Sequence, residues 1–334
     1  PPPPPPPLLF FQAEHGIGAQ PRSRGLGDVY KRQLATRMLA RSTNGIWLGH
    51  KWYTGKNVRT AEPVLPADLV YLEQNLRRHG ITDLFVHVGP ALPDGTFKDQ
   101  PGSVLTDLRN AFPSSRMLAW VGARVEGIPL HEPEFHRKLI ESIGALEAAG
   151  FDGVHFDFEP MAHYEPGYLE LLSRVREEMG PGFMISQATP RASLFGLPPG
   201  PLGRSFWGKN FYLDTMKRSD QTVLMAYDSR FNSVKAYTAF VRHQSSLLAE
   251  WACSVPGHEL LVGLPSYEDV PLYSNPEVEN LTTASRGVRA ALEQHPEPEK
   301  CVAGVAIYSN WVTDEDEWRE FRDHWMHPEA ELAQ

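Results

Sequence analysis

The feature that most constrains the fold of this chain is a series of eight short apolar runs rich in β-branched and aromatic residues. The runs span residues 45–50, 83–88, 116–122, 153–158, 183–187, 222–227, 260–264 and 302–308. The segments between them carry apolar residues at helical spacing, for example Leu69, Leu72 and Leu76, and further on Phe135, Leu139, Ile143 and Leu146. The sequence therefore predicts eight strands that alternate with helices.

Strict alternation of strands and helices requires parallel strands joined by right-handed crossovers. Eight such units over roughly 270 residues close on themselves as a (β/α)8 barrel, which is a single α/β domain. We therefore predict one TIM barrel at 43–328, followed by a short tail at 329–334. The alternative is an open doubly wound sheet, which needs a glycine-rich turn after the first strand. The residues at that place are Lys51, Trp52 and Tyr53.

The first 42 residues do not share this pattern and are set apart from the barrel as an N-terminal extension. Residues 1–7 are all proline, and 11–33 show neither strand nor helix periodicity. Residues 13–33 resemble the translated sequencing-adapter read-through that contaminates assembled metagenomes, and the alternative is a genuine disordered extension. A signal peptide would have preceded Leu34, so we expect the true N-terminus to be missing. The compartment stays open, with a secreted or cell-envelope location favoured.

Charge and cysteine content narrow the kinds of partner. The chain carries a net charge of −9, and leaving out residues 1–33 removes four basic and two acidic side chains, so the remaining body carries −11. This charge disfavours nucleic acid and suits a neutral polymer, and no apolar run approaches the ~20 residues that span a membrane.

Cys253 and Cys301 either form a disulfide or remain two buried thiols. Neither they nor His50 and His87 show metal-ligand spacing, so we predict no metal and no cofactor. The oligomeric state stays open.

The fourth predicted strand ends in a row of ionisable side chains. In a barrel of this kind, the active groups come from the C-terminal ends of the strands. Because strand side chains alternate, His155, Asp157 and Glu159 share the face toward the barrel axis. The Cα atoms of Asp157 and Glu159 are expected ~6–7 Å apart, and the charge of Asp157 should raise the pKa of Glu159. A carboxylic acid that stays protonated near neutral pH can donate to a glycosidic oxygen. The alternative, an acidic turn at a helix N-terminus, leaves the alternation unexplained.

This segment resembles the D-G-x-D-x-D-x-E signature of glycoside hydrolase family 18, the chitinase-like enzymes. Asp152, Gly153, Asp157 and Glu159 match the signature, and His155 replaces its middle aspartate. In the family, that aspartate helps to hold the next one in its working protonation state. The replacement therefore leaves the pH optimum and the efficiency open, but it keeps the acid.

Two further strand ends resemble motifs of the same family. Residues 225–228 read MAYD, similar to the family's M-x-Y-D, and residues 308–311 read YSNW, similar to its terminal tryptophan. The family's S-x-G-G on the third strand is poorly kept, with only Gly122 in place. The resemblance therefore extends over the whole predicted barrel.

The resemblance implies substrate-assisted, retaining hydrolysis of glycans that contain N-acetylglucosamine, in which the acetamido oxygen of the substrate attacks the anomeric carbon. It implies that Glu159 donates the proton, Asp157 orients the acetamido nitrogen and Tyr227 binds the acetamido carbonyl. It also implies that Asp228 contacts the sugar or supports Asp157, and that Trp311 forms the floor of the cleaved sugar's subsite. An oligo- or polysaccharide is the implied partner.

Other residues near the strand ends are secondary candidates. Trp52, Trp120 and Tyr267 are aromatic side chains that can either stack on neighbouring sugars or belong to the core. Asp152 and His155 are expected to support the acidic strand rather than to touch the substrate.

Two alternatives to this mechanism stay open. The first is a two-carboxylate retaining glycosidase, with Glu159 as acid/base and Glu268 as covalent nucleophile. The second is a chitinase-like protein that binds a glycan or a protein partner without hydrolysis, because His155 disables the site. The glycan itself also stays open among chitin, peptidoglycan and the core of N-linked glycans, as does endo or exo action.

Overall fold

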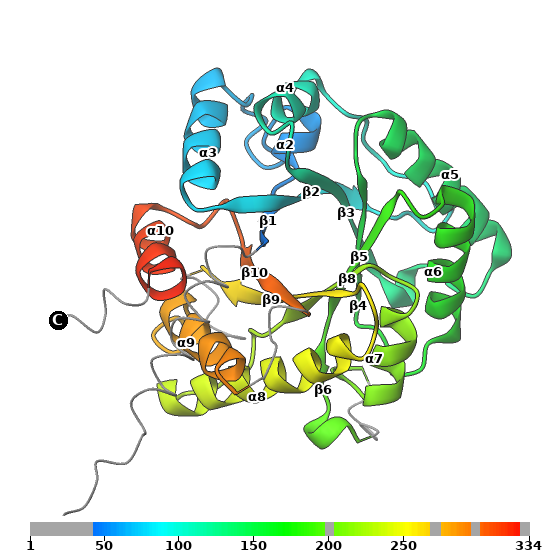
Figure 1. Cartoon of the computed structure of the whole chain (residues 1–334). Coiled ribbons are helices and arrows are strands. Elements are labelled where there is room, and N and C mark those ends of the chain that lie inside the picture. Colours follow the sequence, from blue (N-terminus) through cyan, green and yellow to red (C-terminus); the bar gives the residue numbers. More distant parts are fainter. Residues whose placement is uncertain (1–42, 198–203, 268–274, 295–300, 328–334) are drawn as a thin grey trace, which may run out of the picture.

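The computed structural model describes residues 43–197, 204–267, 275–294 and 301–327. Within them, eight parallel strands close into a barrel that helices surround (Figure 1). The strands are β1 (Asn44–Leu48), β2 (Ile81–Pro90), β3 (Arg116–Arg124), β4 (Gly153–Glu159), β5 (Met184–Thr189), β8 (Gln221–Met225), β9 (Glu259–Pro265) and β10 (Val302–Tyr308). They follow one another around the barrel in this order, and β10 pairs with β1. The eight predicted strands and the single (β/α)8 fold are confirmed.

The helices lie outside the barrel, between successive strands (Figure 1). They are α2 (Lys51–Thr54), α3 (Pro66–Arg78), α4 (Ser103–Ala111), α5 (Pro133–Ala148), α6 (Pro166–Met179), α7 (Lys209–Met216), α8 (Val234–Cys253), α9 (Leu281–Leu292) and α10 (Glu315–Phe321). Two further strands, β6 (Arg191–Ala192) and β7 (Phe206–Trp207), pair with each other after β5. The sequence did not predict them, because two residues are too few to show a period. The predicted N-terminal extension and C-terminal tail lie outside the described residues.

The strands fill the core on both of their faces. On β1, Ile46 and Leu48 pack into the large apolar layer between strands and helices. Trp47, between them in sequence, faces the barrel axis and packs there with Phe85 and Leu118. This period of two follows from the pleat of a strand. The inside of the barrel is thus filled by side chains, and only its rim is left for a site.

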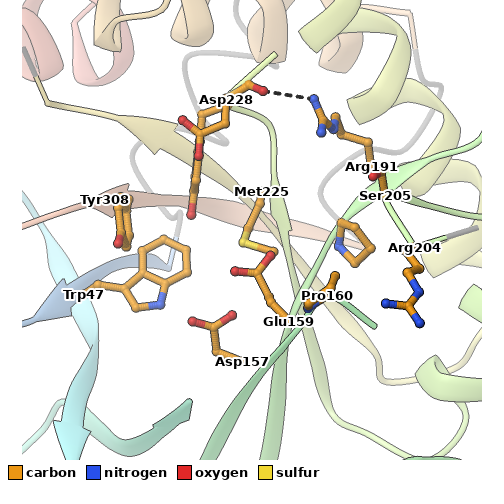
Figure 2. A pocket seen from close by; sticks show the side chains of 12 residues that line it. Trp47, Asp157, Glu159, Pro160, Arg191, Arg204, Ser205, Met225, Asp228 and Tyr308 are labelled. Carbon is orange, nitrogen blue, oxygen red and sulfur yellow. Dashed lines mark hydrogen bonds between the residues drawn. The ribbon is translucent and has the colours of Figure 1, made fainter. Parts of the chain in front are cut away.

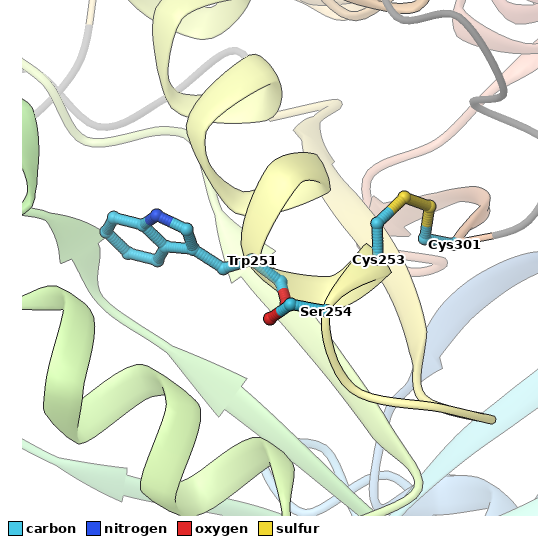
Figure 3. Close-up of a disulfide and its surroundings, with 4 residues drawn as sticks. All are labelled: Trp251, Cys253, Ser254 and Cys301. Carbon is cyan, nitrogen blue, oxygen red and sulfur yellow. A yellow bond between two sulfur atoms is a disulfide. The ribbon is translucent and has the colours of Figure 1, made fainter.

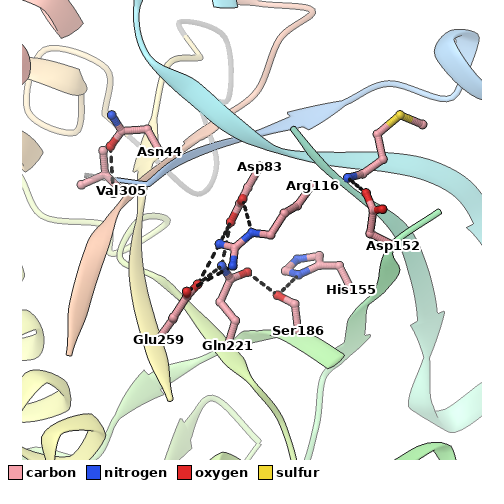
Figure 4. A network of polar contacts seen from close by, with 10 residues as sticks. Asn44, Asp83, Arg116, Asp152, His155, Ser186, Gln221, Glu259 and Val305 are labelled. Carbon is pink, nitrogen blue, oxygen red and sulfur yellow. Dashed lines mark hydrogen bonds and ion pairs between the residues drawn. The ribbon is translucent and has the colours of Figure 1, made fainter. Parts of the chain in front are cut away.

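A buried network of polar side chains lies at the N-terminal ends of four strands (Figure 4). Arg116 donates to both carboxylate oxygens of Asp83, each at 2.7 Å, and to Glu259 at 2.7 and 3.1 Å. Gln221 donates to the same Asp83 carboxylate at 2.8 Å. Burial raises the pKa of Asp83, and the bonds from Arg116 oppose that shift. The buried carboxylate is tolerated because it is paired and fully hydrogen-bonded.

Cys253 and Cys301 are joined in a disulfide, with their Cα atoms 5.0 Å apart (Figure 3). Cys253 is the last residue of α8, and Cys301 directly precedes β10. The bond therefore ties a surface helix to the start of the last barrel strand. None of the helices described here is long and apolar enough to cross a membrane.

Candidate active site

A pocket of about 240 Å³ opens at the C-terminal ends of β1, β4, β8 and β10 (Figure 2). It is lined by Trp47, Asp157, Glu159, Pro160, Pro190, Arg191, Arg204, Ser205, Met225, Tyr227, Asp228 and Tyr308. The structure thus brings together the four residues on which the family resemblance mainly depends: Asp157, Glu159, Tyr227 and Asp228. This is the rim at which (β/α)8 enzymes carry their active groups.

Asp157 has one satisfied and one unsatisfied carboxylate oxygen. Its Oδ2 accepts a hydrogen bond of 2.9 Å from the indole Nε1 of Trp120 on β3. Its Oδ1 is buried and has no hydrogen-bond partner among the described residues. Burial raises the pKa of Asp157 to about 6, and the bond from Trp120 opposes the shift. A buried acceptor without a partner costs free energy, so a rotation of the carboxylate that turns this oxygen toward a donor in the pocket is favoured.

Glu159 is the last residue of β4, two residues beyond Asp157 on the same face of the strand. Burial of the carboxyl, followed by the negative charges of Asp157 and Asp228, raises the pKa of Glu159 to about 8. The predicted cause, repulsion by Asp157, is thus present but ranks second to burial. At neutral pH the carboxyl of Glu159 is protonated and can act as a hydrogen-bond donor.

Tyr227 lies two residues after β8 and is one of the residues that line the pocket. Its ring stacks on that of Tyr308, with centroids 5.3 Å apart and an interplanar angle of 18°, and within the described chain no residue hydrogen-bonds its hydroxyl. The ring fits because residue 263 is a glycine, at which an added Cβ would lie 3.0 Å from Cε1 of Tyr227. Tyr227 therefore offers a hydroxyl without a described partner in the same pocket as Asp157.

Asp228 is held in place by an aromatic neighbour. Its Oδ1 accepts a hydrogen bond of 2.5 Å from the hydroxyl of Tyr267, and its backbone adopts the left-handed conformation, with φ at 54°. Tyr267 is buried, and its ring meets those of Tyr227 and Tyr308 edge-on. Of the two alternatives for Tyr267, the structure favours a core residue, because the side chain is buried and its hydroxyl orients Asp228.

The aromatic floor of the pocket consists of Trp47 and Tyr308, not of Trp311. Tyr308 is the last residue of β10 and lines the pocket, and its ring meets Trp47 edge-on at 5.5 Å. Trp311 lies three residues further on, is 49% exposed, and stacks parallel to Trp120 with centroids 6.3 Å apart. The expected place of Trp311 beneath the cleaved sugar is corrected, because the chain has already left the strand end at Ser309.

A second pocket, of about 500 Å³, lies next to the first and shares Tyr308 with it. Trp120 and Trp311 both line this second pocket, so the two predicted aromatic residues lie together on its wall. Parallel indole rings at a strand end suit the C–H faces of sugars. Trp52, in contrast, is only 2% exposed and packs in the layer between strands and helices. Of the two alternatives for Trp52, the structure therefore favours a core residue.

His155 lies at the bottom of the site and does not touch Asp157. It accepts a hydrogen bond of 3.2 Å from the indole Nε1 of Trp47 through Nε2, and its Nδ1 lies 2.8 Å from the hydroxyl of Ser186. Trp47 can only donate, so the neutral ring carries its hydrogen on Nδ1 and donates to Ser186. Ser186 in turn donates to Gln221, which joins His155 to the buried network (Figure 4). Burial lowers the pKa of His155 to about 3.

Asp152 lies at the opposite end of β4, away from the pocket. Its Oδ2 accepts from the backbone of Met117 at 2.7 Å and pairs with Arg109 at 2.5 Å. It therefore fixes the start of the strand against β3. Glu268, the nucleophile of the two-carboxylate alternative, lies outside the described residues.

Eight pocket residues were not predicted as site residues, and four of them have aromatic or cationic side chains: Trp47, Tyr308, Arg191 and Arg204. Strand alternation places Trp47 inward, and Tyr308 ends the last predicted strand, so the sequence carried a signal for both. Arg191 lies in β6 and Arg204 lies just before β7. Neither position shows a sequence period that predicts an inward side chain. In the part of the chain that the structure covers, no three His, Cys, Asp or Glu side chains form a group that could hold a metal ion.

No protein-family model and no curated protein matches this sequence. Solved structures do match it. The spore cortex-lytic enzyme SleL of Bacillus cereus superposes with a TM-score of 0.57 at 14% identity, over 85% of this chain and 74% of SleL. A putative chitinase A from Streptomyces coelicolor gives 0.57 at 16% identity, over 87% and 99% of the two chains. A fungal endo-β-N-acetylglucosaminidase of glycosyl hydrolase family 18 gives 0.55 at 15% identity, over 86% and 98%. The chain therefore shares the barrel fold of family 18 glycoside hydrolases.

Proposed function

We propose that this protein is a glycoside hydrolase that cleaves glycans next to an N-acetylglucosamine residue, by retaining, substrate-assisted catalysis with Glu159 as general acid/base. The observation that carries this proposal is the pair of unsatisfied polar atoms in the pocket. The buried Oδ1 of Asp157 is an acceptor without a described partner. The hydroxyl of Tyr227, in the same pocket, has no hydrogen-bond partner among the described residues either. An acetamido group, with one N–H and one carbonyl, complements both.

In this mechanism, the protonated Glu159 donates its proton to the glycosidic oxygen as the bond to the anomeric carbon breaks. The carbonyl oxygen of the substrate's acetamido group attacks that carbon and closes a cyclic oxazolinium intermediate. Asp157 accepts the acetamido N–H and stabilises the positive charge that develops there, while Tyr227 orients the carbonyl oxygen. The carboxylate of Glu159 then takes a proton from water, whose oxygen opens the ring with net retention.

The aromatic side chains give this mechanism its binding surface. Trp47 and Tyr308 would support the sugar that is cleaved, because they line the same pocket as both carboxyl groups. Trp120 would act twice, since its indole nitrogen holds Asp157 and its ring, with Trp311, lines the second pocket. The substrate would thus extend from the first pocket into the second.

The proposal is tested by hydrolysis of a chromogenic N-acetylglucosamine oligomer by the full chain, its Glu159→Gln variant and a control variant, Glu147→Gln. Glu147 is an exposed residue of α5 far from the pocket. We expect Glu159→Gln to lower kcat by roughly 100- to 10,000-fold, the range for loss of a general acid, and Glu147→Gln to match wild type. An acetamido-thiazoline, which mimics the cyclic intermediate, should inhibit the wild-type enzyme.

Other results would point to the alternatives. Covalent labelling of Glu268 by a fluorosugar would replace the proposed mechanism with the two-carboxylate one. Saccharide binding by wild type without release of reducing ends would make the protein a glycan-binding barrel.

We also propose a location outside the cytosol, in the secreted or cell-envelope fraction. Its support is the Cys253–Cys301 disulfide, since such bonds persist in oxidising compartments. Alkylation of the protein isolated from its source, followed by mass spectrometry, should find no free thiol at either cysteine. Two alkylated cysteines would contradict the proposal.

A further inference from the structure

The pocket has an aromatic side and a cationic side, with Glu159 between them (Figure 2). Trp47 and Tyr308 lie on one side of the Glu159 carboxyl. Arg191 and Arg204 lie on the other, from the connection that follows β5. A neutral sugar needs the first side, but nothing in the proposed cleavage reaction uses the second.

Arg191 is fixed so that its guanidinium stays at the pocket wall. Its Nη1 donates to the backbone oxygen of Asp228 at 3.2 Å, and its guanidinium carbon lies 5.2 Å from the ring centroid of Phe206. Burial lowers the pKa of Arg191 from its ordinary value, although the group remains charged at all physiological pH. A planar guanidinium that stacks on a ring and uses one of its donors keeps the others for a ligand.

Three carboxyl groups act electrostatically on Arg191: Asp228, Glu279 and Glu159. Glu159 is protonated at neutral pH, and the other two are engaged elsewhere. The side chain of Asp228 binds the hydroxyl of Tyr267, and the carboxylate of Glu279 accepts from the backbone and hydroxyl of Ser229 at 2.8 to 3.1 Å. Within the described part of the chain, no carboxylate forms an ion pair with Arg191. Arg191 is thus a partly buried cation whose charge is only incompletely compensated, and such a group favours an anionic ligand.

Arg204 adds a second cation that a ligand can recruit. It pairs with Glu126, but both side chains are mostly exposed. Ion pairs between exposed side chains contribute little to stability and exchange readily. The second pocket, where the substrate would continue, is also lined by two cations, Lys51 and Arg59. Basic residues therefore line both pockets, although the net charge of the protein is −9. A neutral polymer, which the net charge suggests as the substrate, would leave these basic residues without a binding role.

We propose that the substrate is an acidic glycan, in which the sugar on the leaving side of the cleaved bond carries a carboxylate that Arg191 binds, with Arg204 as a second contact. This inference rests on the proposed hydrolase function. A carboxylate fits better than a phosphate, because it matches the guanidinium fork with a single charge. Asp157 and Asp228 face the same pocket and would repel a dianion more strongly.

Two kinds of glycan alternate N-acetylglucosamine with a carboxylated sugar. In one, the carboxylate belongs to a lactyl ether, as in peptidoglycan strands freed of peptide. In the other, it belongs to a uronic acid, as in hyaluronan oligosaccharides. The test uses both glycans, each in its native form and with its carboxylates converted to amides, together with a neutral chitin oligomer of matched length.

The measured quantity is the ratio of kcat/KM for the native glycan to kcat/KM for its amide. For wild type we expect a ratio of roughly 10 to 100 with at least one of the two glycans, the size expected of charge-assisted hydrogen bonds. Arg191→Gln should bring the ratio close to one. The control variant Arg78→Gln, at an exposed arginine at the end of α3, should keep it. The glycan that gives the larger ratio identifies the source of the carboxylate.

A wild-type ratio near one with both glycans, or an unchanged ratio in Arg191→Gln, would overturn the inference while hydrolysis itself stood. If wild type hydrolysed none of the probes, the proposed function would fail instead. In that case calorimetry measures the binding affinity for each native glycan and for its amide. Equal affinities, or tighter binding of the amides, would overturn the inference independently of hydrolysis.

Discussion

Replacing His155 by glutamine tests whether the buried imidazole is neutral and whether its hydrogen bonds to Trp47 and Ser186 stabilise the pocket. Glutamine can still accept from Trp47 and donate to Ser186, but it does not titrate near neutral pH. At pH 7 we expect the variant to be about 1–2 kcal/mol less stable than wild type, because its amide meets both partners with poorer geometry.

The stronger prediction concerns pH. Burial lowers the pKa of His155 to about 3 in the folded protein, whereas an unfolded histidine has a pKa near 6.5. Below about pH 6.5 the unfolded chain takes up a proton that the folded protein does not, so the stability from this group is present above that pH and is lost as pH falls. Over the roughly 1.5 units down to pH 5, at about 1.36 kcal/mol per unit, wild type should lose about 2 kcal/mol through His155.

The assay is urea unfolding followed by tryptophan fluorescence at pH 7 and at pH 5, for wild type and His155→Gln. All other titrating groups are common to both proteins, so their contributions cancel in the difference. The deficit of the variant at pH 7 should shrink by about 2 kcal/mol at pH 5, while an exposed control, His327→Gln, should show no such change relative to wild type. A deficit that stays constant, or grows, as pH falls would refute the neutral, buried state of His155.

Three further predictions follow from the site and its surroundings. Activity as kcat/KM should fall above about pH 8, where Glu159 loses its proton, and below about pH 6, where Asp157 gains one; a profile without the alkaline limb would exclude Glu159 as the acid. Gly263→Ala should lower the unfolding free energy by about 1–3 kcal/mol and also reduce kcat, because the new methyl group crowds Tyr227. Thermal unfolding and activity are measured together, and a variant that loses only one of the two properties, or neither, would contradict this coupling. Cys253→Ser removes a bond between residues 48 positions apart, so chemical unfolding should show a loss of about 4 kcal/mol by loop-closure entropy, and an unchanged midpoint would mean that the bond does not form in solution.

Much of the fold was predictable because strand and helix leave different periods in the sequence. The runs of β4 and β10 were found nearly residue for residue, since each is apolar, short and bounded by a change of period. The two-residue strands β6 and β7 left no such trace. Their pairing depends on the path that the chain takes across the barrel rim.

Within the pocket, the sequence predicted the relative position of residues on one strand better than that of residues that meet across strands. Asp157 and Glu159 share a face of β4 by the geometry of a strand, so their proximity followed from spacing alone. The sequence did not predict where the side chains of Trp311 and Trp52 lie, and the reason is the same for both. A position near a strand end does not say whether a side chain turns toward the axis, along the rim or into the helical layer.

The sequence by itself determined the barrel, the rim at which the candidate site lies and the acidic strand end, because period and motif are local properties of a chain. Only the tertiary structure decided that His155 binds Trp47 instead of Asp157, and that Asp157 keeps one buried oxygen without a described partner. It also decided that Arg191 reaches the pocket. Burial and hydrogen-bond pairing depend on neighbours that are tens of residues away in sequence, and these neighbours meet only when the barrel closes.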